Sequence, residues 1–286
     1  MKFPNYFADC ESDYKDAEYV IFGVPYDKTS SFRSGAKKAP YEIRQASWNF
    51  ETFNFRSDFD ITDIKIHDYG DLEVESFDTK TMLEKVYKIS KKIIQDKKIP
   101  ICIGGEHSIT PGIIKSFADD IAVLSLDAHM DFRKQYENDK NNHACVVRRI
   151  NDYIPVENIA ILGVRSAEKE EYKEALEQKL FFIDSFEINE KGIDNAIKKT
   201  KDYLGDKKIY LTFDIDALDP AFAPGTSTPE PFGMNPFDVL KIIDSIGSNV
   251  IGFDIVEVCP TYDNGETALI AAKFLRYIIE KSFLKI

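Results

Sequence analysis

Six short apolar runs, rich in Ile, Val and Leu, recur along the 286-residue chain, and most of them lack strict alternation with polar residues. Such runs are typical of strands buried on both faces, as in a parallel sheet covered by helices on both sides. The runs occupy residues 18–25, 98–105, 120–129, 157–164, 207–216 and 248–258. They predict an α/β protein of three layers, with a central, mostly parallel sheet between two layers of helices.

Amphipathic stretches lie between and after the runs and predict the helices that this fold requires. One of them begins with Pro236 and ends with Gly247, residues favoured at the start and at the end of a helix. We expect helices over 79–95, 191–204, 236–247 and 265–284. No internal repeat, low-complexity stretch or Gly/Ser-rich linker divides the sequence, so we expect one domain over residues 1–286.

The composition narrows the classes of partner and location. The net charge of 37 − 49 = −12 argues against nucleic acid, because phosphate binding needs a basic surface, and it suits a small cationic ligand. No run approaches the ~18 apolar residues of a membrane span, and the N-terminus lacks the apolar segment of a signal peptide. The four cysteines are scattered, so no disulfide framework is expected. Together these features predict a cytoplasmic protein that does not bind a membrane.

Four of the apolar runs become polar where they end, in the segments GGEHS, DAHMD, DIDALDP and DIVEVCP. In open α/β sheets, ligands bind beyond the carboxyl ends of the strands. In an extended segment, residues i, i+2 and i+4 point the same way, which would aim Asp127, His129 and Asp131 at one point. The same alternation would place Asp214 and Asp216 on one side. We therefore expect a single shared site at this edge of the sheet.

His107 completes this set, because Gly104 and Gly105 allow a sharp exit from the preceding strand. Four bare carboxylates in a sheet interior would repel one another, and divalent cations remove that conflict. The mixture of oxygen and nitrogen ligands favours Mn²⁺ or Zn²⁺ over Ca²⁺. Six ligands exceed the needs of one zinc, so two metals about 3.5–4 Å apart fit better. Any one of these motifs alone could merely cap a helix, but the three together favour metal binding.

The segments GGEHS, DAHMD and DIDALDP, in this order, resemble the three signature segments of the ureohydrolases, the family of arginase and agmatinase. Further similarity extends over nearly the whole chain, from residues 23–27 through 33–44 and 68–71 to 253–258. The resemblance implies an arginase-like fold, two Mn²⁺ ions per subunit and hydrolysis of a guanidinium group.

The family pattern also implies a role for each ligand. Asp127 and Asp214 would bridge the two metals, and a hydroxide between the metals would be the nucleophile, since two cations lower the pKa of water. Asp131 would also accept a hydrogen bond from that hydroxide. One manganese would be held by His107, Asp127, Asp131 and Asp214, and the other by Asp127, His129, Asp214 and Asp216.

Two more residues match catalytic positions of the family. His143 matches the histidine that transfers a proton to the leaving amine, and an imidazole titrates near the working pH. Glu230 matches the carboxylate that grips the substrate guanidinium through paired hydrogen bonds. Without the resemblance, His143 would be interpreted as a solvated loop histidine and Glu230 as a turn residue between two prolines. His67 has no motif partner and is expected to be structural, and Glu257 with Asp263 is expected at a cation-friendly rim.

The loop over residues 132–143 favours agmatine as the substrate, because it lacks the Ser, Thr and Asn pattern with which arginase recognises arginine. The resemblance is to prokaryotic agmatinases, which release putrescine for polyamine biosynthesis. N1-aminopropylagmatine, guanidinobutyrate and arginine remain alternatives. A guanidinobutyrase would need a cation for the substrate carboxylate, and Arg133, Lys134 or Lys140 could supply it.

Two hypotheses from other classes of protein stay open, a two-metal phosphoesterase and a non-catalytic binding protein. Clustered Asp and His residues also serve two-metal phosphoesterases, although the sequence lacks an obvious Gly-rich phosphate loop. A non-catalytic binding protein would have no chemical need for the six ligands with His143 and Glu230. The family commonly forms trimers or hexamers, so we expect a homo-oligomer.

Overall fold

The computed structural model describes residues 5–117 and 120–284, and its centre is an eight-stranded sheet in which every pair of neighbours is parallel. In sheet order the strands are β4 (Ile66–Asp71), β1 (Tyr19–Val24), β5 (Ile99–Gly104), β10 (Val250–Val256), β9 (Lys208–Asp214), β6 (Ile121–Leu126), β7 (Ile159–Val164) and β8 (Phe181–Asp184). A separate antiparallel hairpin joins β2 (Phe53–Asn54) and β3 (Phe59–Asp60).

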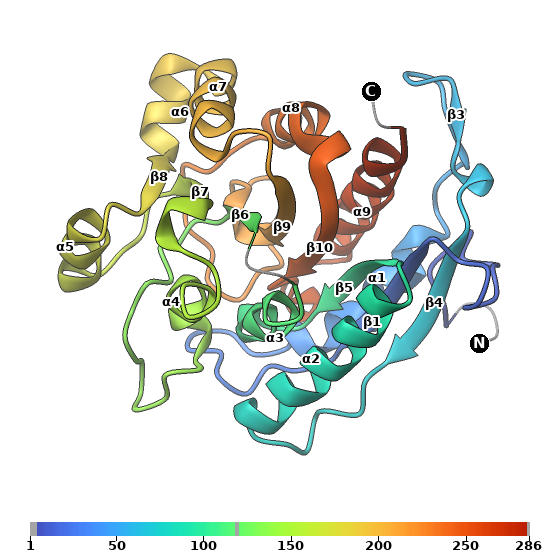
Figure 1. The fold of residues 1–286 in the computed structure, drawn as a ribbon, viewed down its shortest axis with the longest axis horizontal. Helices are drawn as coiled ribbons and strands as arrows, with labels where there is room; N and C mark the ends of the chain where they lie inside the picture. Colours follow the sequence, from blue (N-terminus) through green and yellow to red (C-terminus); the bar gives the residue numbers. More distant parts are fainter. Residues whose placement is uncertain (1–4, 118–119, 285–286) are drawn as a thin grey trace.

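Helices cover both faces of the sheet, and Figure 1 shows α7, α8 and α9 above it and α2, α3 and α4 below it. Strand residues alternate between two apolar clusters: Tyr19 and Ile21 of β1 pack with the first, and Val20 and Phe22 pack with the second. The first cluster includes residues from α1 (Ala39–Ser47), α6 (Ser185–Lys191), α7 (Ile193–Leu204), α8 (Pro236–Ile246) and α9 (Glu266–Leu284). The second includes residues from α2 (Thr79–Gln95), α3 (Thr110–Ile114), α4 (Val146–Ile150) and α5 (Lys169–Glu177). The three-layer α/β/α prediction is confirmed.

All six predicted strands and all four predicted helices are present, with ends that differ by a few residues. The strands β4 and β8 were not predicted, and both lie at the edges of the sheet. Along β4, buried residues alternate with more exposed ones, so it lacks the continuous apolar run that marks a central strand. β8 has only four residues.

The central strands β5, β10, β9 and β6 are neighbours, so their carboxyl ends meet at one place on the sheet edge. This is the place where open α/β sheets bind ligands. Across residues 5–117 and 120–284, no helix combines the length and apolarity needed to cross a membrane.

Candidate active site

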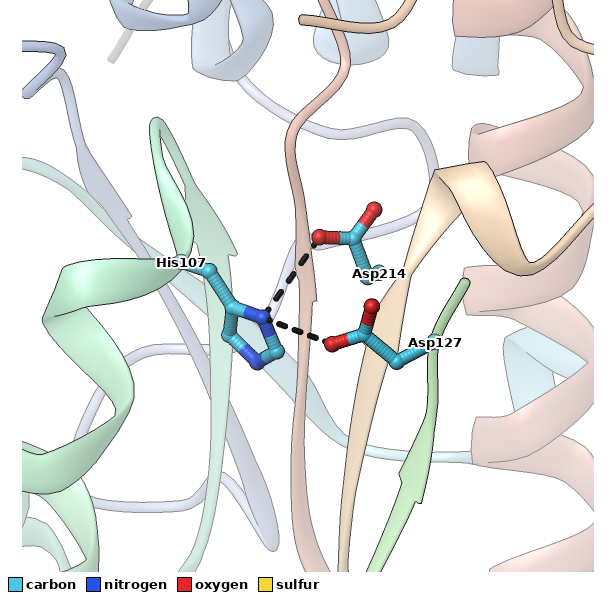
Figure 2. A group of neighbouring side chains, drawn as sticks. All are labelled: His107, Asp127 and Asp214. Atoms are coloured by element: carbon cyan, nitrogen blue, oxygen red, sulfur yellow. Dashed lines mark ion pairs between the residues drawn. The ribbon is translucent and has the colours of Figure 1, made fainter. Parts of the chain in front are cut away.

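Three buried side chains converge at the carboxyl ends of β5, β6 and β9. His107 follows β5 and opens a short 3-10 helix (His107–Ile109), Asp127 follows β6, and Asp214 ends β9. The Nδ1 atom of His107 lies 3.2 Å from Oδ2 of Asp127 and 3.5 Å from Oδ2 of Asp214. Figure 2 shows the imidazole pointing at both carboxylates. We call these three residues the inner group.

A second cluster shares Asp127 and lies closer to solvent. Nδ1 of His129 is 2.9 Å from Oδ2 of Asp216 and 3.7 Å from Oδ1 of Asp127. We call Asp127, His129 and Asp216 the outer group. In each group the candidate ligand atoms lie within 4.8 Å of one another. Asp131 joins the inner side, with its Oδ2 3.4 Å from Nδ1 of His107. The structure thus brings all six predicted ligands together.

The expected reason for this convergence was wrong, because neither segment is an extended strand. β6 ends at Leu126, and the chain then turns: the backbone N–H of His129 donates to Oδ1 of Asp127 at 2.6 Å, and Asp131 has a φ of 49°. Asp216 lies in a 3-10 helix (Ile215–Ala217), and its N–H donates to Oδ1 of Asp214 at 2.8 Å. Turns stabilised by the carboxylates themselves therefore aim these side chains.

Gly105 is required at the start of this site. A Cβ at this position would overlap the backbone of Tyr26. The carbonyl oxygen of Gly105 accepts the N–H of Glu257 at 2.8 Å, and the carbonyl oxygen of Tyr26 accepts the N–H of Glu106 at 2.8 Å. This close approach links the segments that carry His107 and Glu257.

The chemistry of the two groups fits divalent cations. Nδ1 of His107 and Oδ2 of Asp127 are buried, and neither has a hydrogen-bond partner among the residues that the structure describes. Burial raises the pKa of the Asp131 carboxyl to about 7, and the charge of Asp127 adds to this shift. Burial also raises the pKa of Asp214 well above its ordinary value. Because buried charges are stable only when paired or coordinated, these residues suit a pair of metal ions.

A cavity of about 180 Å³ opens over the two groups. His143 reaches its wall from a 3-10 helix (His143–Cys145) that Asn142 caps with its side chain. Burial lowers the pKa of the His143 imidazole, so the ring is neutral near pH 7. Four of the six candidate ligands line this wall, namely His107, His129, Asp131 and Asp214, and the wall also includes Ser31, Arg133, Tyr136, Glu171, Thr228 and Glu257.

Comparisons with known proteins give the family and the fold. The model of the Arginase family matches residues 17–280. The chain belongs to the arginase family. It is 35% identical to an agmatinase of Halalkalibacterium halodurans, covering 96% of this chain and 95% of that protein. It is also 35% identical to an N(1)-aminopropylagmatine ureohydrolase of Thermococcus kodakarensis, covering 92% of this chain and 90% of that protein. The crystal structure of an agmatine ureohydrolase of Thermoplasma volcanium superposes with a TM-score of 0.94 at 39% identity, covering 99% of this chain and 96% of that one.

The two glutamates near the centre of this arginase-family site differ in position. Glu257 has a φ of 61°, is buried, and lines the cavity. Its Oε1 accepts the N–H of His107 at 2.6 Å, whereas its Oε2 has no hydrogen-bond partner among the described residues. Glu230 lies on the outer side, where its side chain is 38% exposed and its Oε1 is 3.9 Å from Nε2 of His129.

The remaining predicted positions are structural. Asp263 does not line the cavity; it accepts the N–H groups of Gly265 and Thr267 and so caps α9. Nδ1 of His67 lies 2.9 Å from the carbonyl oxygen of Ser12, which agrees with a structural role.

One residue that the sequence did not single out is Arg165, which follows β7. Its guanidinium donates to the carbonyl oxygens of Asp216 at 2.6 Å and Glu230 at 2.8 Å, and also to those of Gly163 and Leu218. Arg165 therefore connects the loop after β9 to the end of β7. No local motif marks it, because all its partners are backbone atoms and three of the four named here lie far away in the sequence.

Proposed function

We propose that the protein is an agmatinase, which hydrolyses agmatine to putrescine and urea with two bound Mn²⁺ ions. The observation that carries this proposal is the pair of histidine–carboxylate groups that share Asp127 beside a cavity lined by His143 and Glu257. Arginase-family membership and agmatinase relatives over nearly the whole chain support the same class of reaction.

The proposed metal centre uses the inner group, the outer group and Asp131. Two imidazoles and four carboxylates form a nitrogen and oxygen ligand set that Mn²⁺ accepts. Asp127 belongs to both groups and would be a ligand of both ions. Asp214 belongs to the inner group and stays a predicted ligand of both ions from the family pattern. Two divalent cations held there would supply a nucleophilic hydroxide at neutral pH.

Substrate recognition at this centre needs an anion for the guanidinium. Glu257 offers a buried carboxylate oxygen with no partner among the described residues, on the cavity wall next to His107. A planar guanidinium would satisfy that oxygen through charge-assisted hydrogen bonds. Glu230 stays a predicted guanidinium ligand, and its position beside His129 gives it the outer approach to the same substrate.

His143 is the proposed proton carrier. Hydrolysis forms a C–O bond at the guanidinium carbon and breaks the C–N bond to the alkyl amine, which must gain a proton to leave. Because His143 is neutral near pH 7 and lines the cavity, its imidazole can take up the proton of the attacking water and deliver it to the leaving nitrogen. Asp131 remains the proposed hydrogen-bond acceptor for the attacking oxygen.

The residues that could hold the far end of the substrate bear on guanidinobutyrate as the alternative to agmatine. Of the three candidate cations, Arg133 lines the cavity, whereas Lys134 is exposed and pairs with Glu174 at 3.2 Å, and Lys140 lies at a different pocket. Nε of Arg133 is 3.5 Å from Oε2 of Glu171, a buried carboxylate on the same wall. An ammonium end would be drawn to Glu171, and a carboxylate end, as in guanidinobutyrate, would be drawn to Arg133.

The test of the proposed function is urea release by the Mn²⁺-loaded protein with agmatine, aminopropylagmatine, guanidinobutyrate and arginine, each with a chelated control. We expect agmatine to give the highest kcat/KM and chelation to abolish turnover. Dominance of guanidinobutyrate would assign the far end to Arg133. Absence of urea with all four substrates, or hydrolysis of a phosphate ester instead, would overturn the proposal.

The roles of the two glutamates are separated by Glu257→Gln and Glu230→Gln. If Glu257 holds the guanidinium, its variant should lose about 100-fold or more in kcat/KM, and Glu230→Gln should lose about tenfold or less through KM. The reverse order would assign the guanidinium to Glu230.

Three further expectations stay proposals: a cytoplasmic location, a trimeric or hexameric assembly, and folding as one domain.

A further inference from the structure

A buried network of hydroxyl groups contacts the Nε2 side of His107, whereas the inner group's carboxylates face its Nδ1. Nε2 of His107 is 2.9 Å from Oγ1 of Thr212, and that hydroxyl donates to Oδ1 of Asp254 at 2.6 Å. The other oxygen of Asp254 accepts from the hydroxyls of Tyr210 at 2.7 Å and Thr110 at 3.0 Å. Asp254 is fully buried in β10, and three hydroxyls donate to it.

The direction of these hydrogen bonds determines which ring nitrogen of His107 carries a hydrogen. A threonine hydroxyl has one proton and two acceptor lone pairs. Because Thr212 donates its proton to Asp254, its oxygen can only accept from His107. Nε2 of His107 must then carry a hydrogen, so in the neutral ring that binds metal the Nδ1 lone pair faces Asp127 and Asp214.

The same arrangement recurs at His143 with different residues. The hydroxyl of Thr29 donates to Oε1 of Glu106 at 2.7 Å, and the hydroxyl of Ser108 donates to that oxygen at 2.6 Å. The Thr29 oxygen accepts the backbone N–H of His143 at 3.0 Å and lies 3.3 Å from its Nδ1. Nε2 of His143 lies 3.2 Å from the hydroxyl of Ser31.

The hydrogen bonds around His143 require the opposite tautomer. The Thr29 proton goes to Glu106, so the Thr29 oxygen can only accept from the His143 ring. Nδ1 of His143 must carry the hydrogen, and Nε2 keeps its lone pair. The Ser31 hydroxyl can then donate to Nε2.

We propose that two carboxylate–threonine pairs set opposite tautomers of the two histidines: Asp254 and Thr212 hold the proton of His107 on Nε2, and Glu106 and Thr29 hold the proton of His143 on Nδ1. The first pair presents a nitrogen lone pair to the metal centre, and the second presents one to the proton-transfer position. Partners of this kind orient metal-binding histidines and raise their basicity. The roles of the two rings rest on the proposed function, whereas the tautomers do not.

The chain has four histidines, so their tautomers can be read directly by two-bond ¹H–¹⁵N correlation spectra of protein labelled with ¹⁵N-histidine. The sample is loaded with Zn²⁺, which is diamagnetic, at pH 8. We expect a protonated Nε2 at His107 and a protonated Nδ1 at His143. His67 is the internal reference, because its Nδ1 faces a carbonyl oxygen and must be protonated. A protonated Nδ1 at His107, or a protonated Nε2 at His143, overturns the corresponding half of the proposal.

Variants separate positioning from mere packing. Thr212→Val and Thr29→Val keep the side-chain shape and remove the hydroxyl, and Thr212→Ser and Thr29→Ser restore it. We expect Thr212→Val to weaken binding of one Zn²⁺ by about 10–100-fold in chelator competition, and we expect Thr29→Val to mix the tautomers of His143. Each serine variant should return to the wild-type result.

The matched control is Thr200→Val, which removes a buried hydroxyl that donates to the carbonyl oxygen of Ala196 on α7. It should change neither spectrum nor metal affinity. An unchanged His143 tautomer in Thr29→Val, together with an unchanged Zn²⁺ affinity in Thr212→Val, would overturn the proposal. Failure to bind Zn²⁺ would count against the proposed function, and the His143 spectrum would still test the Thr29 pair.

Discussion

The inner and outer groups use the same ligand chemistry but owe their positions to different parts of the fold. The His107 side chain is 1% exposed, and its second ring nitrogen is hydrogen-bonded to Thr212 on β9. The His129 side chain is 23% exposed, and its second ring nitrogen faces Glu230 at 3.9 Å, beyond hydrogen-bond distance. The inner group is therefore fixed by the strands, and the outer group depends on the loops above them.

Because of this difference, the two groups should contribute unequally to the stability of the fold and to the function of the site. Groups that are hydrogen-bonded inside the sheet contribute to folding as well as to metal binding, because an unpaired buried polar group is costly. Groups at the cavity mouth can move without opening the core. We expect substitutions in the inner group to destabilise the protein, and those in the outer group to act mainly on metal binding and turnover.

The largest effect should come from Asp127, because it belongs to both groups. Asp127→Asn removes the shared charge, so we expect loss of both metals and a decrease in kcat/KM of at least about 1,000-fold, several kcal/mol of transition-state stabilisation. Metal content by mass spectrometry and urea release would measure it. Asp78→Asn, at the exposed N-cap of α2, is the matched control and should leave both unchanged. Retention of two metals in Asp127→Asn would show that the groups are independent.

The second prediction compares the two histidines directly. In metal-free protein, His107→Asn should lower the free energy of unfolding by about 3 kcal/mol, because it breaks a buried network of charges and hydroxyls. His129→Asn should lower it by about 1 kcal/mol, because its ring is partly exposed and Asp216 still accepts the N–H of Ala128 at 3.0 Å. Urea denaturation with a chelator present measures both. Equal losses would contradict the distinction between the groups.

The inner group was the more predictable half from sequence. Long apolar runs locate the central strands, and ligands at the ends of neighbouring parallel strands must converge. His107, Asp127 and Asp214 follow this rule directly, because each lies at or just beyond a strand end. The outer ligands were also predicted from this pattern, but from an extended geometry that the chain does not adopt, and the family resemblance added His143 and Glu230, which the strand pattern could not place.

The remainder depends on contacts that have no local signature. Glu257 was expected only at the rim, because the pattern DIVEV does not reveal the φ of 61° that directs the chain at this residue. Asp254 was not singled out, since its partners Tyr210 and Thr110 come from other elements. Arg165 binds backbone carbonyls, which any sequence supplies. Long-range hydrogen bonds of this kind become visible only in the folded chain.

Arg165 provides a third, smaller test of the outer group. Arg165→Lys keeps the charge but loses the planar fork that reaches the carbonyls of Asp216 and Glu230 together. We expect about a tenfold decrease in kcat/KM and weaker binding of one metal, with a loss of about 1–2 kcal/mol in stability. Arg56→Lys, at an exposed ion pair with Asp244, is the matched control. An unchanged Arg165→Lys enzyme would show that the loop holds its position without this clamp.

The last prediction concerns the pH dependence of metal binding, which involves both the inner and the outer group. Burial alone would lower the pKa of His107 and of His129, but the surrounding carboxylates raise both well above the ordinary value in the metal-free protein. Their stabilising effect is present below pH 6.5 and is lost as the pH rises through the raised pKa values. Metal binding needs neutral imidazoles, and also an ionised Asp131, whose pKa is about 7.

In the proposed metal centre, metal and protons would therefore compete for the same atoms. We expect metal binding at pH 7 to release at least about one proton per metal, and the apparent Kd to decrease by about tenfold per pH unit for each proton released. Calorimetry in buffers of different ionisation enthalpy counts the protons. As the pH rises from 6.5, the Tm of metal-free protein should decrease while that of Mn²⁺-loaded protein holds or increases. Parallel pH profiles for the two forms would mean that the two imidazoles are already neutral before the metal binds.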